Sequence, residues 1–254
     1  MQRSVMRPGG AQSTLAERLR ISWRMAKGQA RYLRKAVKGV LGQHPRECPL
    51  CGYRGMFMNF GTPPRFDVVC PRCRSHPRQR LLKLVQEREG LIPPHAEILH
   101  FAAERTLRPM ISAAGPKRYV TADLKEGLDL RLNVEKIDLP DSSFDVVICS
   151  HVLEHVDDRA ALSDLHRVLR PAGRAILMVP IIEGSERTYE DSSITSWHDR
   201  KLHFGGGTHV RQYGRDFRDR VRAAGFALRE YCADDYEPVR FGLVWGERVF
   251  VGTK

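Results

Sequence analysis

Residues 95–158 read HAEILHFAAERTLRPMISAAGPKRYVTADLKEGLDLRLNVEKIDLPDSSFDVVICSHVLEHVDD. Three short apolar runs, at 97–101, 118–122 and 144–149, alternate here with a helical pattern and with turn residues. Short strands that alternate with helices are typical of βαβ units, which assemble a parallel sheet. We therefore expect an α/β fold whose central sheet begins near residue 97.

Each of these runs is followed by a polar side chain, at the end where an open parallel sheet binds its ligand. Glu104 comes shortly after the first run, Asp123 directly after the second, and Ser150 and His151 directly after the third. An acid at the end of the second strand is placed to accept hydrogen bonds from ribose hydroxyls. Asp123 is therefore the candidate for binding a ribose.

Two motifs carry a family resemblance. Residues 140–156 read PDSSFDVVICSHVLEHV, and after an expected helix residues 167–180 read RVLRPAGRAILMVP. These motifs resemble the class I S-adenosylmethionine (SAM)-dependent methyltransferases of the type 11 group, and the resemblance extends over residues 96–251. It implies a Rossmann-like sheet with helices on both faces, SAM as cofactor, and a last strand that runs antiparallel to its neighbours.

The resemblance also places individual residues against SAM. It implies that Glu104 meets the ammonium group, that Asp123 binds the ribose, and that Asn133 and Val134 contact the adenine. Related enzymes usually have a glycine-rich turn after the first strand, whereas residues 102–103 of this chain are alanines. Zinc-ribbon members of the same group have a similar variant of this turn. The full expected cofactor set is His100, Ala102, Glu104, Asp123, Leu124, Asn133, Val134, Ser150 and His151.

Four cysteines near the N-terminus follow a pattern typical of a metal site. Cys48, Cys51, Cys70 and Cys73 form two C-x2-C pairs separated by eighteen residues, which is the spacing of a four-thiolate zinc site. Two disulfides fit poorly in a chain with no export signal. Because four thiolates leave no open position for chemistry, we expect a structural zinc ion in a small ribbon.

The net charge of +12 is concentrated in the first third of the chain. Residues 1–46 and 47–90 carry net charges of +10 and +4, and the remainder carries −2. A capping box at Thr14 and Glu17 begins a basic amphipathic helix that is expected to end at Gly42. The helix is a candidate for contact with an anionic membrane surface, with RNA or with a partner. The favoured interpretation is that its apolar stripe packs on the protein or on a second copy.

The composition is that of a globular protein, with 254 residues of which 42% are hydrophobic and 28% charged. No apolar run approaches the roughly 18 residues that span a bilayer, and no signal-peptide pattern is present, so we expect a cytoplasmic protein. Four parts are expected. They are a basic tail and helix (1–44), a zinc ribbon (45–75), a linker helix (76–94) with Arg78 and Arg80 on an exposed face, and a methyltransferase domain (95–254).

A long segment without clear periodicity, residues 183–213, is expected to be a substrate lid. It leaves the carboxyl end of the fifth strand, where ligands bind, and glycines 205–207 offer a hinge. The segment is rich in ionisable side chains. The catalytic base is expected to be His209 or His151, and the further candidates are His203, Asp191 and Glu190.

The sequence thus predicts methyl transfer from SAM, which requires alignment of the acceptor and, for a hydroxyl, removal of a proton. The resemblance to relatives in saccharide and natural-product pathways implies a hydroxyl of a small molecule, sugar or glycoconjugate. An RNA base methyltransferase is the alternative favoured by the charge of +14 on residues 1–90. The near-neutral remainder and the lack of an Asn-Pro-Pro-Tyr-type motif oppose it. A non-catalytic scaffold with a degenerate methyltransferase fold is the third interpretation.

Overall fold

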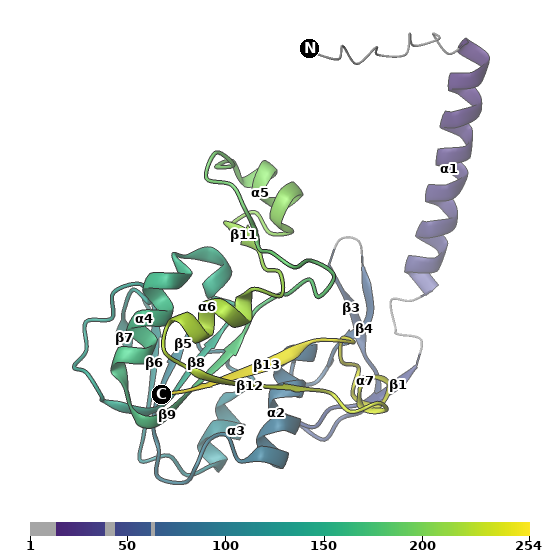
Figure 1. The fold of residues 1–254 in the computed structure, drawn as a ribbon. Coiled ribbons are helices and arrows are strands. Elements are labelled where there is room, and N and C mark those ends of the chain that lie inside the picture. Colours follow the sequence, from purple (N-terminus) through teal and green to yellow (C-terminus); the bar gives the residue numbers. More distant parts are fainter. Residues whose placement is uncertain (1–13, 39–43, 62–63) are drawn as a thin grey trace, which may run out of the picture.

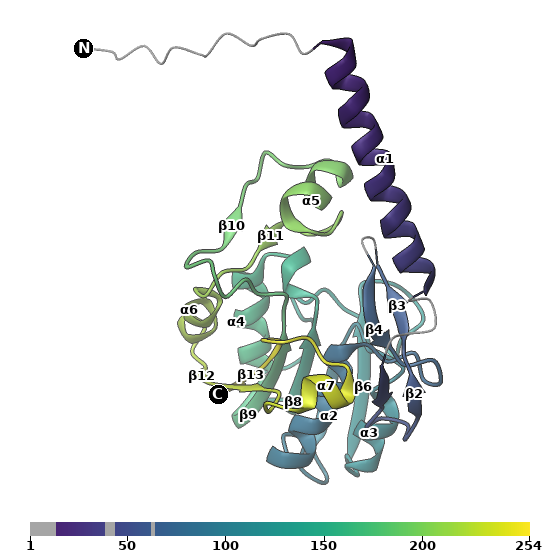
Figure 2. The same ribbon diagram turned by 90° about the vertical axis from the view of Figure 1, so that its right-hand side faces the viewer.

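The computed structural model describes residues 14–38, 44–61 and 64–254, and Figures 1 and 2 show it in two orientations. In chain order its elements are α1 (Leu15–Lys38), β1 (Pro45–Glu47), β2 (Arg54–Met56), β3 (Met58–Phe60), β4 (Arg65–Val69), α2 (Pro77–Glu89), β5 (Glu97–Phe101), α3 (Arg108–Ala113), β6 (Arg118–Asp123), β7 (Leu130–Arg131), β8 (Phe144–Ser150), η1 (Leu153–His155), α4 (Asp158–Val168), β9 (Leu169–Met178), β10 (Tyr189–Glu190), α5 (Trp197–Phe204), β11 (Arg211–Gln212), α6 (Phe217–Ala223), β12 (Ala227–Cys232), α7 (Glu237–Phe241) and β13 (Arg248–Thr253).

A seven-stranded mixed sheet forms the centre of the fold, with the strand order β12-β13-β9-β8-β5-β6-β7. The neighbours from β9 to β7 pair in parallel, whereas β13 pairs antiparallel with both β9 and β12. The three strands predicted first begin at the expected residues, and the antiparallel last strand is confirmed. This topology is the Rossmann-like sheet that the sequence predicts.

Helices cover both faces of this sheet, because side chains of a buried strand alternate between the faces. On β5, Leu99 and Phe101 join a core cluster that also contains residues of α4 and α6. Ile98 points the other way and joins a cluster with residues of α2 and α3. The carboxyl ends of the parallel strands therefore meet at one edge of the sheet, between two covered faces.

Two short antiparallel hairpins, β1–β2 and β3–β4, form the small ribbon that precedes the sheet. Helix α2 follows the ribbon and begins with a capping box formed by His76 and Gln79. It ends at Gly90, whose left-handed φ of 56° suits a residue without a Cβ atom. Figure 2 shows the ribbon beside α7 of the large domain.

Helix α1 confirms the predicted amphipathic helix, but the expected packing of its apolar stripe on the protein is wrong. Leu19, Trp23 and Leu33 are 62%, 62% and 64% exposed, and both views show α1 standing clear of the sheet (Figures 1 and 2). Packing on a second copy stays a prediction, and the expected stop at Gly42 lies outside the described residues. None of the helices among the described residues is long and apolar enough to cross a membrane.

The segment at 183–213, which has no clear periodicity in the sequence, contains the β10–β11 hairpin and the helix α5. Ser196 caps α5 by accepting the backbone N–H of Asp199, and Gly205 ends the helix with a left-handed φ of 79°. The sequence pattern misses these elements because each is short and amphipathicity needs several turns to be recognised. Figure 1 shows α5 at the tip of the segment, away from the sheet.

Candidate functional site

The four cysteines lie on two turns with the same backbone geometry. The first cysteine of each pair, Cys48 or Cys70, accepts at its carbonyl the backbone N–H four positions later, at 2.8 and 2.9 Å. Those residues, Gly52 and Arg74, both have a left-handed backbone, with φ of 71° and 63°. The repeated turn presents both cysteines of each pair to one point, as a metal knuckle requires.

The four Sγ atoms form a compact group. Cys48 Sγ lies 3.6 Å from Cys73 Sγ, Cys51 Sγ lies 3.7 Å from Cys70 Sγ, and all four lie within 4.8 Å of one another. Sulfurs about 2.3 Å from one tetrahedral ion are about 3.8 Å apart, so this spacing is a zinc-binding one. Burial raises the pKa of the Cys51 and Cys70 thiols. A bound cation would therefore be what holds the sulfurs of Cys51 and Cys70 as thiolates at neutral pH.

A fully buried arginine lies beneath the cysteine cluster. Arg80 is 0% exposed, and its guanidinium donates to the carbonyls of Ser75 at 2.6 Å, Val68 at 2.8 Å, Phe241 at 2.8 Å and Gly242 at 2.7 Å. Burial lowers its pKa to about 10, so the group is still charged at neutral pH. The predicted exposure of Arg80 is wrong, because two of the carbonyls that its guanidinium contacts belong to the distant α7 region.

Glu104, the residue expected to meet an ammonium group, is fixed by the start of α2. Its Oε1 accepts hydrogen bonds from Arg78 Nη2 at 2.7 Å, Arg78 Nε at 2.9 Å and Gln79 Nε2 at 2.8 Å. Its Oε2 is buried and has no hydrogen-bond partner among the described residues. Arg78, expected on an exposed helix face, is 27% exposed and also holds this carboxylate. One carboxylate oxygen is thus held in place while the other remains available to a cationic group.

The turn after β5 has the backbone that a glycine would favour, although its residues are alanines. Ala102 has a left-handed φ of 48°, and its N–H donates to Ala122 O at 2.8 Å. At the end of β8, Ser150 Oγ is buried without a described partner. This edge therefore combines a left-handed turn with unpartnered polar atoms, a combination that fits a bound polar molecule.

The other expected cofactor residues lie at the same edge with different environments. Asp123 ends β6, and its Oδ1 accepts the backbone N–H of Lys125 at 3.0 Å. Leu124 beside it is 55% exposed. The Oδ1 of Asn133 accepts the backbone N–H of Glu135 at 3.0 Å, which forms a turn around the buried Val134.

His100 differs from the rest of the expected cofactor set because its side chain is fully buried. Its Nδ1 lies 2.9 Å from Tyr119 Oη, and burial lowers its pKa to about 3. The side chain therefore remains neutral at physiological pH. Its direct contact with a cofactor stays a prediction.

Three histidines gather around one buried carboxylate beyond the end of β8. His151 Nδ1 lies 3.1 Å from Glu154 Oε1, and Glu154 is 0% exposed. A ring nitrogen of His155, a ring nitrogen of His209 and a carboxylate oxygen of Glu154 all lie within 4.8 Å of one another. Burial raises the pKa of Glu154, but the contact with His151 outweighs this effect and the net shift is downward. The sequence prediction includes His151 and His209 but misses Glu154.

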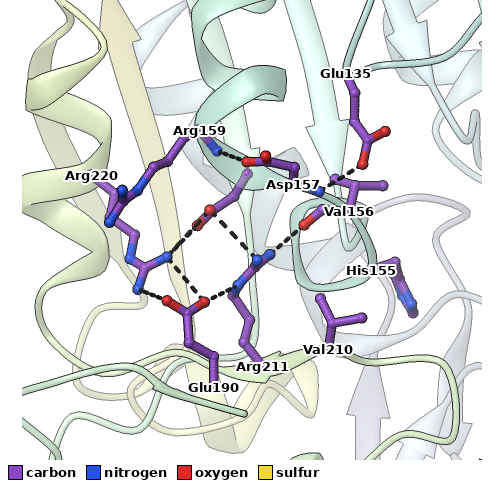
Figure 3. Close-up of a pocket in the computed structure, with 10 residues that line it drawn as sticks. Glu135, His155, Val156, Asp157, Arg159, Glu190, Val210, Arg211 and Arg220 are labelled. Atoms are coloured by element: carbon purple, nitrogen blue, oxygen red, sulfur yellow. Dashed lines mark hydrogen bonds and ion pairs between the residues drawn. The ribbon is translucent and has the colours of Figure 1, made fainter. Parts of the chain in front are cut away.

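The base of the 183–213 segment is fastened by an ion-pair network, which Figure 3 shows. Glu190 accepts from Arg211 Nε at 2.9 Å and from Arg220 Nη2 at 3.0 Å. Arg220 Nη1 also lies 3.1 Å from the buried Asp158, and Arg211 Nη1 donates to Leu153 O at 2.8 Å. The four charged residues of this network line a cavity of about 490 Å³. Glu190, one of the further candidates for the catalytic base, therefore helps to hold the segment against η1.

The remaining predicted catalytic residues lie on the exposed outer part of the segment. His203 Nδ1 is 2.8 Å from Tyr189 Oη. Asp191 accepts the backbone N–H and the hydroxyl of Ser193 at 2.9 and 2.6 Å. Both His203 and Asp191 are exposed, and neither belongs to the group around Glu154.

Comparison with known proteins identifies the large domain. Residues 108–177 match the family model described as a methyltransferase domain. Over 89 residues the chain is 34% identical to a probable S-adenosylmethionine-dependent methyltransferase of Mycolicibacterium smegmatis, which covers 34% of this chain and 31% of that protein. Residues 108–177 therefore form part of a methyltransferase domain. The match spans about a third of the length of this relative.

Solved methyltransferase structures resemble the domain more weakly. A SAM-dependent methyltransferase of Mesorhizobium loti gives a TM-score of 0.49 at 16% identity, covering 68% of this chain and 98% of that chain. The 1,6-didemethyltoxoflavin-N1-methyltransferase of Burkholderia thailandensis gives 0.47 at 18% identity, covering 70% and 75%. A complex of the Trm112 activator with a putative methyltransferase of Haloferax volcanii gives 0.47 at 15% identity, covering 66% and 87%. Because these TM-scores are below 0.5, the Rossmann-like fold is assigned from the strand order alone.

A second cavity of the methyltransferase domain, of about 400 Å³, lies at the carboxyl ends of β8 and β9. It is bordered by His151, by Arg65 of the ribbon and by a loop near the C-terminus that contains Trp245 and Glu247. Trp245 is 67% exposed. Glu247 Oε2 is buried without a described partner, and burial raises the pKa of this carboxyl. Sequence reasoning misses this C-terminal loop because nothing local distinguishes it from an ordinary connection.

Two glycines in the expected hinge of the methyltransferase domain are closely packed. A Cβ atom at Gly206 would lie 2.5 Å from the ring of His209, and one at Gly207 would lie 2.1 Å from the ring of Trp197. Close approach of these rings thus explains the absence of side chains at both positions. The hinge itself stays a prediction.

Proposed function

We propose that this chain is a SAM-dependent methyltransferase that methylates a hydroxyl of a small polar acceptor, such as a sugar or a glycoconjugate. The observation that carries the proposal is the contact of His151 Nδ1 with the buried carboxylate of Glu154, at 3.1 Å. A histidine oriented by a carboxylate is suited to remove a proton. A hydroxyl acceptor requires such a base when it attacks a methyl group.

The residues at the carboxyl edge of the sheet would hold the cofactor. Bound SAM supplies a methyl group activated by a sulfonium centre. Glu104 Oε2, which has no described partner, would accept hydrogen bonds from the ammonium group of the cofactor. Asp123 at the end of β6 would bind the ribose hydroxyls. Asn133 and Val134 would border the adenine, and the left-handed turn at Ala102 would bring the backbone close to the cofactor.

The cavity of about 400 Å³ beside His151 would hold the acceptor. Its lining combines the exposed ring of Trp245 with charged groups such as Arg65, Glu183 and Arg248. An aromatic ring offers a face for the apolar side of a sugar, while charged groups bind its hydroxyls. This mixture supports a polyhydroxylated acceptor over an apolar one. The acceptor hydroxyl would then lie beside His151.

His151 is better placed than His209 to act as the base. An ionised Glu154 only accepts hydrogen bonds, so His151 Nδ1 carries the proton and its Nε2 is free to take another. The side chain of His151 is 29% exposed and borders the acceptor cavity. His209 is half-buried, and burial lowers its pKa. It lies outside the lining of that cavity.

The cysteine cluster would bind one structural zinc ion through Cys48, Cys51, Cys70 and Cys73. Four thiolates leave no position open for a substrate, so the ion would act on stability and not on the reaction. The ribbon would nevertheless support activity, because Arg65 borders the acceptor cavity and α2 fixes Glu104 through Arg78.

The proposal is tested by following the label of methyl-labelled SAM into a panel of saccharides, glycoconjugates and small metabolites. We expect label in a hydroxyl-bearing acceptor with the wild type and a decrease of about 10²-fold with His151→Gln. The matched control is His198→Gln on the exposed outer helix. Label in an amine or in RNA would contradict the acceptor class. An undiminished rate for His151→Gln would reject His151 as the base.

An RNA base methyltransferase is the second candidate, because residues 1–90 carry a net charge of +14 and α1 is exposed. RNA retention that falls steeply with salt and disappears when residues 1–44 are deleted would favour this candidate. A non-catalytic scaffold is the third candidate. It would be favoured if the purified protein fails to bind SAM.

A further inference from the structure

A second group of metal-binding side chains lies outside the cysteine cluster. Glu154 and His155 belong to η1, and His209 comes from the segment before β11. One nitrogen from each imidazole and one carboxylate oxygen lie within 4.8 Å of one another. Ligands about 2.1 Å from one tetrahedral ion are about 3.4 Å apart. The three side chains would therefore need to approach one another by at most about 1.4 Å to share an ion.

Both histidines are held in the tautomer that a metal ligand requires. His155 Nδ1 lies 3.2 Å from Thr208 O, and His209 Nδ1 lies 3.1 Å from Phe204 O. A carbonyl oxygen can only accept, so each Nδ1 must carry a proton. Each Nε2 is then left with a lone pair. Such hydrogen bonds from the far nitrogen are the usual support of histidines that bind metals.

The carboxylate of Glu154 supplies an independent indication of a missing ligand. The residue is 0% exposed, and its Oε1 is occupied by His151 Nδ1 at 3.1 Å. Its Oε2 is buried and has no partner among the described residues. A buried, ionised oxygen without a partner costs several kcal/mol, and a cation is the group that would satisfy it.

The backbone around the three side chains is also fixed. The N–H of Val210 donates to the carbonyl of Glu154 at 2.9 Å, which ties the residue next to His209 to η1. The rings of His155 and His209 meet edge to face, with centroids 4.8 Å apart. The site is therefore prepared by structure that does not depend on a bound ion.

We propose that Glu154 Oε2, His155 Nε2 and His209 Nε2 bind a divalent transition-metal cation. Two imidazoles and one carboxylate suit zinc, cobalt, manganese or iron, whereas magnesium and calcium prefer oxygen ligands alone. Unlike the four-cysteine site, this one leaves coordination positions open. Its role in the reaction rests on the proposed function. The ion would act on the reaction through Glu154, whose Oε1 orients His151, because none of the three ligands lines the cavity beside His151.

The metal site can be tested without an acceptor. The full-length protein is dialysed against a mild chelator, and elemental analysis verifies that one zinc per chain remains in the ribbon. Cobalt(II) is then titrated while heat and visible absorption are recorded. We expect one further equivalent of cobalt, with weak bands typical of nitrogen and oxygen ligands and without the strong thiolate-to-cobalt band. His155→Ala, His209→Ala and the isosteric Glu154→Gln should each weaken binding by about 10²-fold.

The control is His198→Ala, which removes an exposed histidine of the same segment and should bind cobalt like the wild type. Retained zinc and an unchanged far-ultraviolet spectrum verify that each variant is folded. No cobalt beyond the ribbon zinc in the wild type, or equal affinity in Glu154→Gln, would overturn the proposal. Cobalt binding without methyl transfer would preserve the metal site and reject the proposed function. Methyl transfer by a protein that binds no cobalt would reject the metal site and preserve the proposed function.

Discussion

The guanidinium of Arg80 donates to the carbonyl of Gly242 at 2.7 Å, across 162 positions of the chain. The contact joins the helix that leaves the cysteine ribbon to the end of α7 in the methyltransferase domain. The close packing of the ribbon leaves no room for a side chain at Gly242, where a Cβ atom would lie 2.8 Å from Asp67 O. The ribbon is therefore fastened to the domain by a buried charge and not by an apolar surface alone.

Replacing Arg80 should destabilise the whole protein. Arg80→Met would leave the carbonyls of Val68, Phe241 and Gly242 without their donor in a buried site, at a cost of about 3–5 kcal/mol. The measurement is urea unfolding of the zinc-loaded protein. Arg54→Met is the matched control, because that side chain is 76% exposed, and its effect should stay within about 0.5 kcal/mol. Equal stability of the two variants would show that the buried guanidinium contributes little.

The cysteine cluster should retain one zinc ion per chain through chelator dialysis. Cys48→Ser combined with Cys70→Ser removes one ligand from each turn and should abolish the retained zinc, as measured by elemental analysis. Cys232→Ser is the control, because Cys232 is a free and exposed cysteine far from the cluster in sequence. Zinc that persists in the double variant would place the ion elsewhere.

The buried His100 should make stability depend on pH. Its folded-state pKa of about 3 lies below the ordinary value of 6.5, so between these values only the unfolded chain binds the proton. The contribution of neutral His100 is fully present above about pH 6.5 and is lost as the pH falls, by about 1.4 kcal/mol per unit. From pH 6.5 to 5, the stability advantage of the wild type over His100→Leu should therefore shrink by about 2 kcal/mol. The test is urea unfolding of both proteins across this pH range. A constant difference in their free energies of unfolding would contradict the prediction.

Substitution of Gly206 should lower turnover more than it lowers SAM affinity. In Gly206→Ala the new Cβ atom would overlap the ring of His209 and displace it from Glu154. We expect turnover to fall about tenfold or more while SAM affinity stays nearly intact, because a misplaced group affects the reaction first. Gly184→Ala is the control, since a Cβ atom there meets no atom within 4 Å. Equal turnover of both variants would show that the position of His209 is unimportant.

The sequence predicts the elements whose signals are local. Runs of apolar residues between turns predict β5, β6 and β8 to within one residue of their observed ends, and the cysteine spacing predicts a cluster. Arg80 escapes prediction because its partners in α7 are more than 160 positions away. Glu154 escapes for a related reason. Its neighbour His209 comes from a distant segment of the chain, and η1 is too short to have a periodic pattern that predicts burial.

The most direct test of the account is a calorimetric titration of the purified full-length protein with SAM, because every later step requires the cofactor. We predict one site per chain, and losses of about tenfold or more with Asp123→Ala and with Glu104→Gln, each of which removes a charge-assisted hydrogen bond worth about 1.5–3 kcal/mol. Glu87→Gln, which alters an exposed carboxylate on α2 that pairs with Lys83, should bind like the wild type. No binding heat in the wild type, or one affinity for all four proteins, would contradict the account.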